Sequence, residues 1–92
     1  MKSLGEPKIK ELVLDVLKPN IPSLPAFATF LAELPGVEYV EVSLVEKDER
    51  TESLEVILQG CDISYDSLKE HVGKQGAVIH SVDQVVVENK KG

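Results

Sequence analysis

The residues from Glu11 to Pro22 constrain the fold of this chain more than any other stretch. Leu12, Leu14 and Val16 alternate with more polar positions, a spacing that is typical of a β-strand with one buried face. Pro19 then ends the strand, because proline has no N–H to donate to a ladder. The residues after the prolines have helical spacing, so this stretch predicts a strand that leads through a rigid exit into a helix.

A second strand of suitable length to pair with the first is predicted near the C-terminus, from Val78 to Val87. Between the two, the pattern predicts a helix capped by Ser23, a hairpin of two alternating strands, and a second helix capped by Ser64. Crossovers in a sheet are right-handed, which limits the possible arrangements. The economical one is an α+β, ferredoxin-like split βαβ fold (βαββαβ), with an antiparallel sheet in the order 4-1-3-2 and two helices on one face.

The length of 92 residues suits one domain. We expect residues 1–7 to be a flexible N-terminal arm, residues 8–88 to form a single domain, and residues 89–92 to be a C-terminal tail. No apolar run is long enough to span a membrane, the N-terminus lacks the apolar block of a secretory signal, and the single cysteine excludes an intrachain disulfide. These features predict a cytoplasmic protein with no membrane partner.

The acidic balance bears on the choice of partner. Sixteen acidic residues against ten basic ones give a net charge of −6, which repels phosphate backbones. Nucleic acid is therefore excluded as the expected partner. A surface of this sign suits cations or a basic partner better.

Two helices cover only one face of such a sheet, so the other face is predicted to be open. Large apolar side chains alternate there with carboxylates, which is more apolar surface than a solvated face needs. We interpret this excess of apolar surface as a subunit contact and predict a homo-oligomer. The edge strand around Val85 to Val87 is expected to be a second surface for self-association. The alternative is that these are scattered surface aliphatics that need no explanation. The predicted contact residues are Val13, Leu17, Tyr39, Val45 and Ile57.

Asp15 stands in the middle of a strand between two aliphatic residues, an unusual place for a charge. With Glu11 or Asp83 it is a candidate ligand of a hard cation such as calcium or magnesium, which prefer carboxylate oxygens. The alternatives are that Asp15 pairs with Lys18 or Lys10, or that it faces water, and base rates for exposed carboxylates favour these. No other cofactor is indicated.

His80 and Ser81 lie on the last predicted strand, close to the level of Asp15. We reject a Ser/His/Asp triad because there is no nucleophile elbow and because consecutive strand residues point to opposite faces. His80 is expected to be packed, hydrogen-bonded, or in polar contact across an interface. The pattern does not indicate which face of the sheet it occupies. His71, on the second helix, is expected to be solvated.

Two motifs carry a family resemblance. Leu-Asp-Val-Leu-Lys-Pro (Leu14 to Pro19) and Gly-Ala-Val-Ile-His-Ser-Val-Asp-Gln-Val-Val (Gly76 to Val86) resemble the domain of unknown function 211 family, small proteins mainly of archaea. The resemblance runs from about Lys8 to Val87, and it implies a ferredoxin-like fold that assembles into cyclic oligomers, with no established activity. Asn20, where the family more often has histidine, is a departure. The motif positions that the resemblance marks for testing are Asp15, Lys18, Pro19, His80, Ser81 and Asp83.

Together these patterns predict a non-enzymatic, ring-forming homo-oligomer that binds a hard divalent cation or a small ligand near its subunit contacts. An alternative is a small-molecule-sensing regulatory module whose ligand lies between subunits near Lys18 and His80. A third, less favoured alternative is an enzyme that uses His80 with Asp15. The sequence indicates neither the subunit number nor the identity of the ligand.

Overall fold

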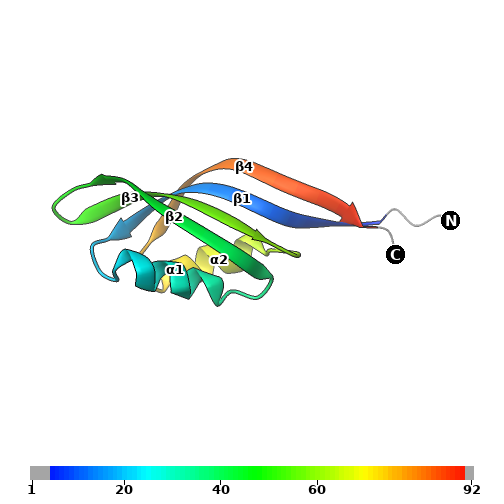
Figure 1. The fold of residues 1–92 in the computed structure, drawn as a ribbon, viewed down its shortest axis with the longest axis horizontal. Coiled ribbons are helices and arrows are strands. Elements are labelled where there is room, and N and C mark those ends of the chain that lie inside the picture. Colours follow the sequence, from blue (N-terminus) through cyan, green and yellow to red (C-terminus); the bar gives the residue numbers. More distant parts are fainter. Residues whose placement is uncertain (1–4, 91–92) are drawn as a thin grey trace.

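The structure, a computed structural model, describes residues 5–90, with the side chain of Lys90 excepted. Over these residues the chain forms four strands and two helices: β1 (Glu6–Pro19), α1 (Leu24–Ala32), β2 (Val37–Lys47), β3 (Thr51–Gly60), α2 (Tyr65–Gly73) and β4 (Val78–Lys90). The strands form one antiparallel sheet in the order β2-β3-β1-β4, and both helices lie on one face of it (Figure 1). This confirms the predicted ferredoxin-like α+β fold, since the strand order read from the other edge is 4-1-3-2.

The core lies between the helices and the two central strands. Alternate residues of β1 and β3 point into it, and the helices contribute residues at the spacing of one helical face. Both helices begin where predicted: the Ser23 hydroxyl accepts the N–H of Ala26 at 3.3 Å, and the Ser64 hydroxyl accepts that of Ser67 at 3.2 Å. The buried apolar side chains are Leu12, Leu14, Val16, Phe27, Leu31, Leu34, Leu54, Val56, Leu58, Ile63, Leu68, Val72 and Ala77.

The strands are much longer than the helices that cover them. Each helix has nine residues, whereas β1 has 14 and β4 has 13. A nine-residue helix spans about 14 Å, and a 13-residue strand spans about 43 Å. The sheet therefore extends past the helical layer at both ends, as the β2–β3 hairpin on one side and the outer part of β1 and β4 on the other (Figure 1).

The outer part of β1 and β4 is a two-stranded arm. Strand β3 pairs with β1 only from Glu11 onward, whereas β4 pairs with β1 from Glu6. We define the arm as residues 6–9 with residues 87–90. Because of this arm, β1 and β4 are both longer than predicted. The end of each strand pairs with the end of the other. Of the predicted flexible arm and tail, residues 1–4 and 91–92 lie outside the described residues.

The base of the arm is attached to the loop that precedes α2. The N–H of Ile63 donates to the carbonyl oxygen of Ile9 at 3.0 Å. The Lys8 ammonium lies 3.4 Å from the Asp62 carboxylate, and this hydrogen bond raises the pKa of Lys8 above its ordinary value of 10.5. These contacts fix where the arm leaves the domain.

Strand β4 does not alternate regularly. Its register with β1 shifts so that His80 and Asp83 are extra residues, each placed between two paired positions. Ser81 is paired with Asp15, and Gln84 is paired with Val13. Because of the bulges, no simple odd or even set of β4 residues shares one face.

Lys18 is buried, and an extensive set of contacts compensates its charge. The alternation of β1 turns it inward, on the same side as Val16. Its ammonium lies 2.8 Å from the Glu52 carboxylate and donates to the carbonyl oxygens of Pro19, at 2.7 Å, and of Pro22. All three N–H donors of the ammonium are therefore occupied, and β1, β3 and the loop before α1 are joined at one point.

We expect Lys18→Ala to lower the free energy of unfolding by clearly more than the loss of a surface ion pair does, because it takes from the Glu52 carboxylate its buried partner and leaves it only the exposed Lys47. Urea denaturation measures this change. The control is Lys10→Ala, which removes a partly exposed ion pair with Glu88 at 3.8 Å and is expected to cost less than about 1 kcal/mol. Equal losses in the two variants would contradict a structural role for the Lys18 contact.

The same contact predicts a pH dependence. The hydrogen bond from Lys18 holds the pKa of Glu52 below its ordinary value of 4.5, and Lys47 acts in the same direction. A lowered pKa contributes stability that is present above 4.5 and is lost as the pH falls through the folded-state pKa. We therefore expect Glu52→Gln to be less stable than the wild type at pH 7, and the difference to shrink in acid. Melting temperatures between about pH 7 and 3 check this, and a difference that is constant with pH would contradict it.

Candidate functional site

Within the described residues, no helix covers the second face of the sheet, which we call the open face (Figure 1). The structure places all the predicted contact residues on it. Val13 and Ile57 are opposite each other in the ladder and half-buried, whereas Leu17, Tyr39 and Val45 are more exposed, at 41%, 48% and 69%. Their role in a subunit contact stays a prediction.

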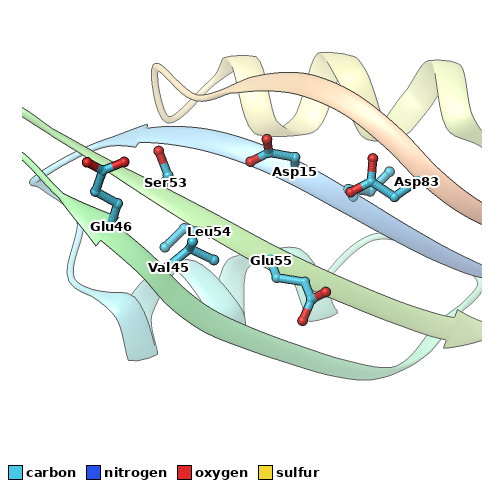
Figure 2. A pocket seen from close by; sticks show the side chains of 8 residues that line it. Asp15, Val45, Glu46, Ser53, Leu54, Glu55 and Asp83 are labelled. Atoms are coloured by element: carbon cyan, nitrogen blue, oxygen red, sulfur yellow. The ribbon is translucent and has the colours of Figure 1, made fainter.

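A shallow concavity of about 320 Å³ opens on this face. Asp15 and Glu55 lie opposite each other on β1 and β3, and Asp83 reaches the same hollow from a bulge of β4. Figure 2 shows the side chains of Asp15 and Asp83 near one another, with Glu46 at the far end of the hollow. The lining residues are Leu14, Asp15, Val45, Glu46, Ser53, Leu54, Glu55 and Asp83.

The concavity is strongly acidic. Its lining contains four carboxylates and, among the residues that the structure describes, no lysine or arginine. The Ser81 hydroxyl donates to the Asp83 carboxylate at 2.8 Å and offsets part of its charge. Like charges placed directly opposite in a ladder, such as those of Asp15 and Glu55, are destabilising. The hollow is therefore a place where a cation or a donor-rich group gains favourable interactions.

The predicted cation ligands are only partly brought together. Asp15 and Asp83 line the same concavity, but Glu11 is four residues along β1, roughly 13 Å away, and accepts a hydrogen bond from Gln59 at 3.1 Å. In residues 5–90 no group of three or more His, Cys, Asp or Glu side chains is arranged to hold a metal ion. A hard cation would therefore need further oxygen ligands from water or from a second chain.

Sequence reasoning missed Glu55 and Glu46 as members of this cluster. The alternation of β3 places Glu55 on the open face, but only the register places it opposite Asp15. Glu46 follows an irregularity between Leu44 and Glu46 in the β2–β3 ladder, which no pattern in the sequence marks.

The remaining predicted site residues are divided between two faces of the sheet. Lys18 is buried on the helix side, and Pro19 is half-buried beside it. Ser81 is paired with Asp15 on the open face, and His80 is exposed at its bulge. Any ligand of Lys18 would have to displace one of the three oxygens that already bind its ammonium.

The expectation that His71 is solvated is wrong. Its ring is half-buried and stacks on that of Phe30, with the ring centroids 3.8 Å apart and the planes inclined by 3°. Its Nε2 lies 2.6 Å from the carbonyl oxygen of Phe30, near the end of α1. His71 therefore joins the two helices, a packing role that helical spacing alone does not reveal.

The fold and the open acidic face define a small α+β protein of the ferredoxin-like class. The chain belongs to the family described as "Uncharacterized ArCR", the domain of unknown function 211 family, whose profile matches residues 10–91. It is 34% identical over 82 residues to the uncharacterized protein MJ0319 of the archaeon Methanocaldococcus jannaschii, an alignment that covers 89% of this chain and 84% of that protein. The family resemblance of the two motifs is confirmed. None of the helices within residues 5–90 is long and apolar enough to cross a membrane.

We expect Asp15→Asn to raise the free energy of unfolding by about 0.5 kcal/mol at low ionic strength, because it removes a like-charge pair from the ladder. Salt near 1 M, with a screening length of about 3 Å, should abolish the gain. Thermal unfolding in the two buffers measures it. The control is Asp66→Asn in the first turn of α2, where the helix dipole favours a negative charge, so that this variant should lose stability. A destabilised Asp15→Asn would mean that this carboxylate has a favourable partner.

Proposed function

We propose that this protein is a non-enzymatic, cytoplasmic assembly protein that forms a closed homo-oligomer, such as a ring, through its sheet. A hard divalent cation or a small ligand binds in the acidic concavity, close to a subunit contact. The observation that carries the proposal is the amount of apolar surface that the chain leaves in contact with water.

Large hydrophobic side chains are exposed along the strands that the helices fail to cover. Isolated cases are ordinary on any protein surface, but adjacent ones are associated with interaction sites. Here most of them lie on the edge strands β2 and β4, where the backbone is also free to pair. The exposed large hydrophobic residues are Leu17, Ile21, Tyr39, Leu44, Val45, Val78, Val82, Val85, Val86 and Val87.

The shape of the chain supports the same proposal. Its radius of gyration is 14.4 Å, and its extents are 57 × 22 × 18 Å. A compact domain of this length has a radius of gyration of about 12 Å. The accessible surface is 5821 Å², whereas a compact monomer of this mass has about 5,300 Å². Association with further copies removes this excess.

The concavity is the second element of the proposal. Its carboxylates repel each other, so the hollow is more stable when it holds positive charge. The described part of one chain does not complete a metal site, so a cation there would take further oxygen ligands from water or from a neighbouring chain. The sensor alternative has less support, because the donors of Lys18 are all occupied.

Native mass spectrometry tests the assembly, first as purified, then with calcium, and then with a chelator. We expect a discrete oligomer that calcium tightens and the chelator loosens, because the shared cation screens the carboxylates. An oligomer that changes with neither calcium nor chelator would support the assembly and refute the bound cation. A monomer in all conditions, at concentrations up to the millimolar range, would overturn the proposal.

A further inference from the structure

The open face carries charge of one sign. From Glu11 to Leu17 of β1, where all four strands are paired, none of the residues that the ladders join is a lysine or an arginine. The acidic residues that the structure places on this face are Glu11, Asp15, Glu41, Glu46, Glu55 and Asp83. Only a partner with positive charge is electrostatically complementary to such a surface.

Two carboxylates at the middle of this face have no partner. Glu11, Glu41 and Asp83 each accept a hydrogen bond from a neutral side chain. Asp15 and Glu55, which we call the central carboxylates, form no hydrogen bond or ion pair with any residue that the structure describes. Since like charges directly opposite each other destabilise a ladder, a positive group bound here stabilises the sheet.

Apolar side chains surround the central carboxylates. Val13 and Ile57, which pair with each other, flank them on one side, and the pair of Leu17 and Val78 lies on the other. Leu17 and Val78 are exposed to 41% and 60%, and Tyr39 on β2 is exposed to 48%. Adjacent exposed hydrophobic side chains are typical of interaction sites. A ligand that covers this face therefore needs apolar groups as well as positive charge.

The shape and the charge of the face select the kind of partner. Small-molecule sites bury most of their ligand in pockets of roughly 300–1,000 Å³, whereas this concavity is shallow and has a volume of only about 320 Å³. A nucleic acid is repelled by the carboxylates, and a second copy, with its net charge of −6, brings further negative charge. A basic segment of another protein supplies both cationic and apolar side chains.

We propose that the open face is a docking site for a basic segment of another protein. The segment places an arginine or a lysine in the concavity beside the central carboxylates and apolar side chains against Leu17, Ile57 and Tyr39. Arginine suits the concavity because its guanidinium has five N–H donors in a planar fork that matches carboxylates. The contact goes beyond the proposed function, since it requires no self-association, and it names a second occupant for the carboxylates of the proposed cation site.

Three fluorescent synthetic peptides test the chemistry of the partner by anisotropy. The first contains arginine and leucine, the second has glutamate in place of each arginine, and the third has serine in place of each leucine. We expect the arginine–leucine peptide to bind at least about tenfold more tightly than either of the others, because the face offers both charge and apolar surface. Equal binding of the glutamate peptide, or of the serine peptide, would overturn the proposal.

A pair of double variants tests the location. Asp15→Asn with Glu55→Gln removes the central carboxylates and should weaken binding of the arginine–leucine peptide by at least about tenfold. The matched control is Asp66→Asn with Glu70→Gln, which changes the net charge equally at two exposed positions of α2. This control should change the affinity by less than about twofold, because charges distant from the contact are screened by salt. Equal losses in both double variants would refute the site.

The apolar part of the contact has its own pair of variants. Leu17→Ser should weaken binding of the arginine–leucine peptide severalfold, because it removes an exposed apolar side chain from the open face. The control is Ile21→Ser, which removes a large aliphatic side chain that is exposed to 84% in the loop before α1, outside the sheet. An unchanged affinity in Leu17→Ser, or an equal loss in the control, would contradict the proposed contact.

Native mass spectrometry separates this inference from the proposed function. A wild type that forms a calcium-responsive oligomer but does not bind the arginine–leucine peptide would refute the docking site and leave the proposed function intact. A wild type that is a monomer, yet binds the peptide and loses it when the central carboxylates are replaced, would refute the assembly and support the docking site.

Discussion

The mismatch between short helices and long strands determines most of what is unusual in this structure. Helices of nine residues cover about 14 Å of strands that reach about 43 Å. The middle of the sheet therefore builds a dry core, whereas its two ends have no second layer. The exposed Val87 of the arm is a consequence of this geometry, whereas Val82, which pairs with the buried Leu14, is exposed because β4 is an edge strand.

Strand β1 divides its chemistry between two environments. Its alternation turns Lys18 into the core, where three oxygens bind the ammonium, and turns Asp15 outward to face Glu55. The inward charge holds the end of the sheet to the loop before α1. The outward charges create an acidic hollow on the open face. One six-residue motif thus contributes both to stability and to the acidic character of the open face.

Several elements were predictable from local patterns. The alternation of Leu12, Leu14 and Val16 predicted the buried face of β1, and Ser23 and Ser64 predicted the starts of both helices, because capping and periodicity depend on residues close in the chain. The prediction that His71 is solvated was wrong because its contacts are not local. Its partner, Phe30, belongs to another helix, and contact between the two depends on how the helices pack. The grouping of Asp15 with Glu55 likewise depends on a ladder register.

The sequence by itself determined the order of the elements, the strand topology and the acidic, partly apolar character of the open face, because these follow from periodicity, turn chemistry and charge. Tertiary structure alone decided where β4 bulges and what buries Lys18. These are settled by contacts between residues far apart in the chain: the ladder that inserts His80 and Asp83, and the Glu52 carboxylate opposite Lys18. Local pattern fixes which side chains alternate, but the pairing of strands fixes which ones meet.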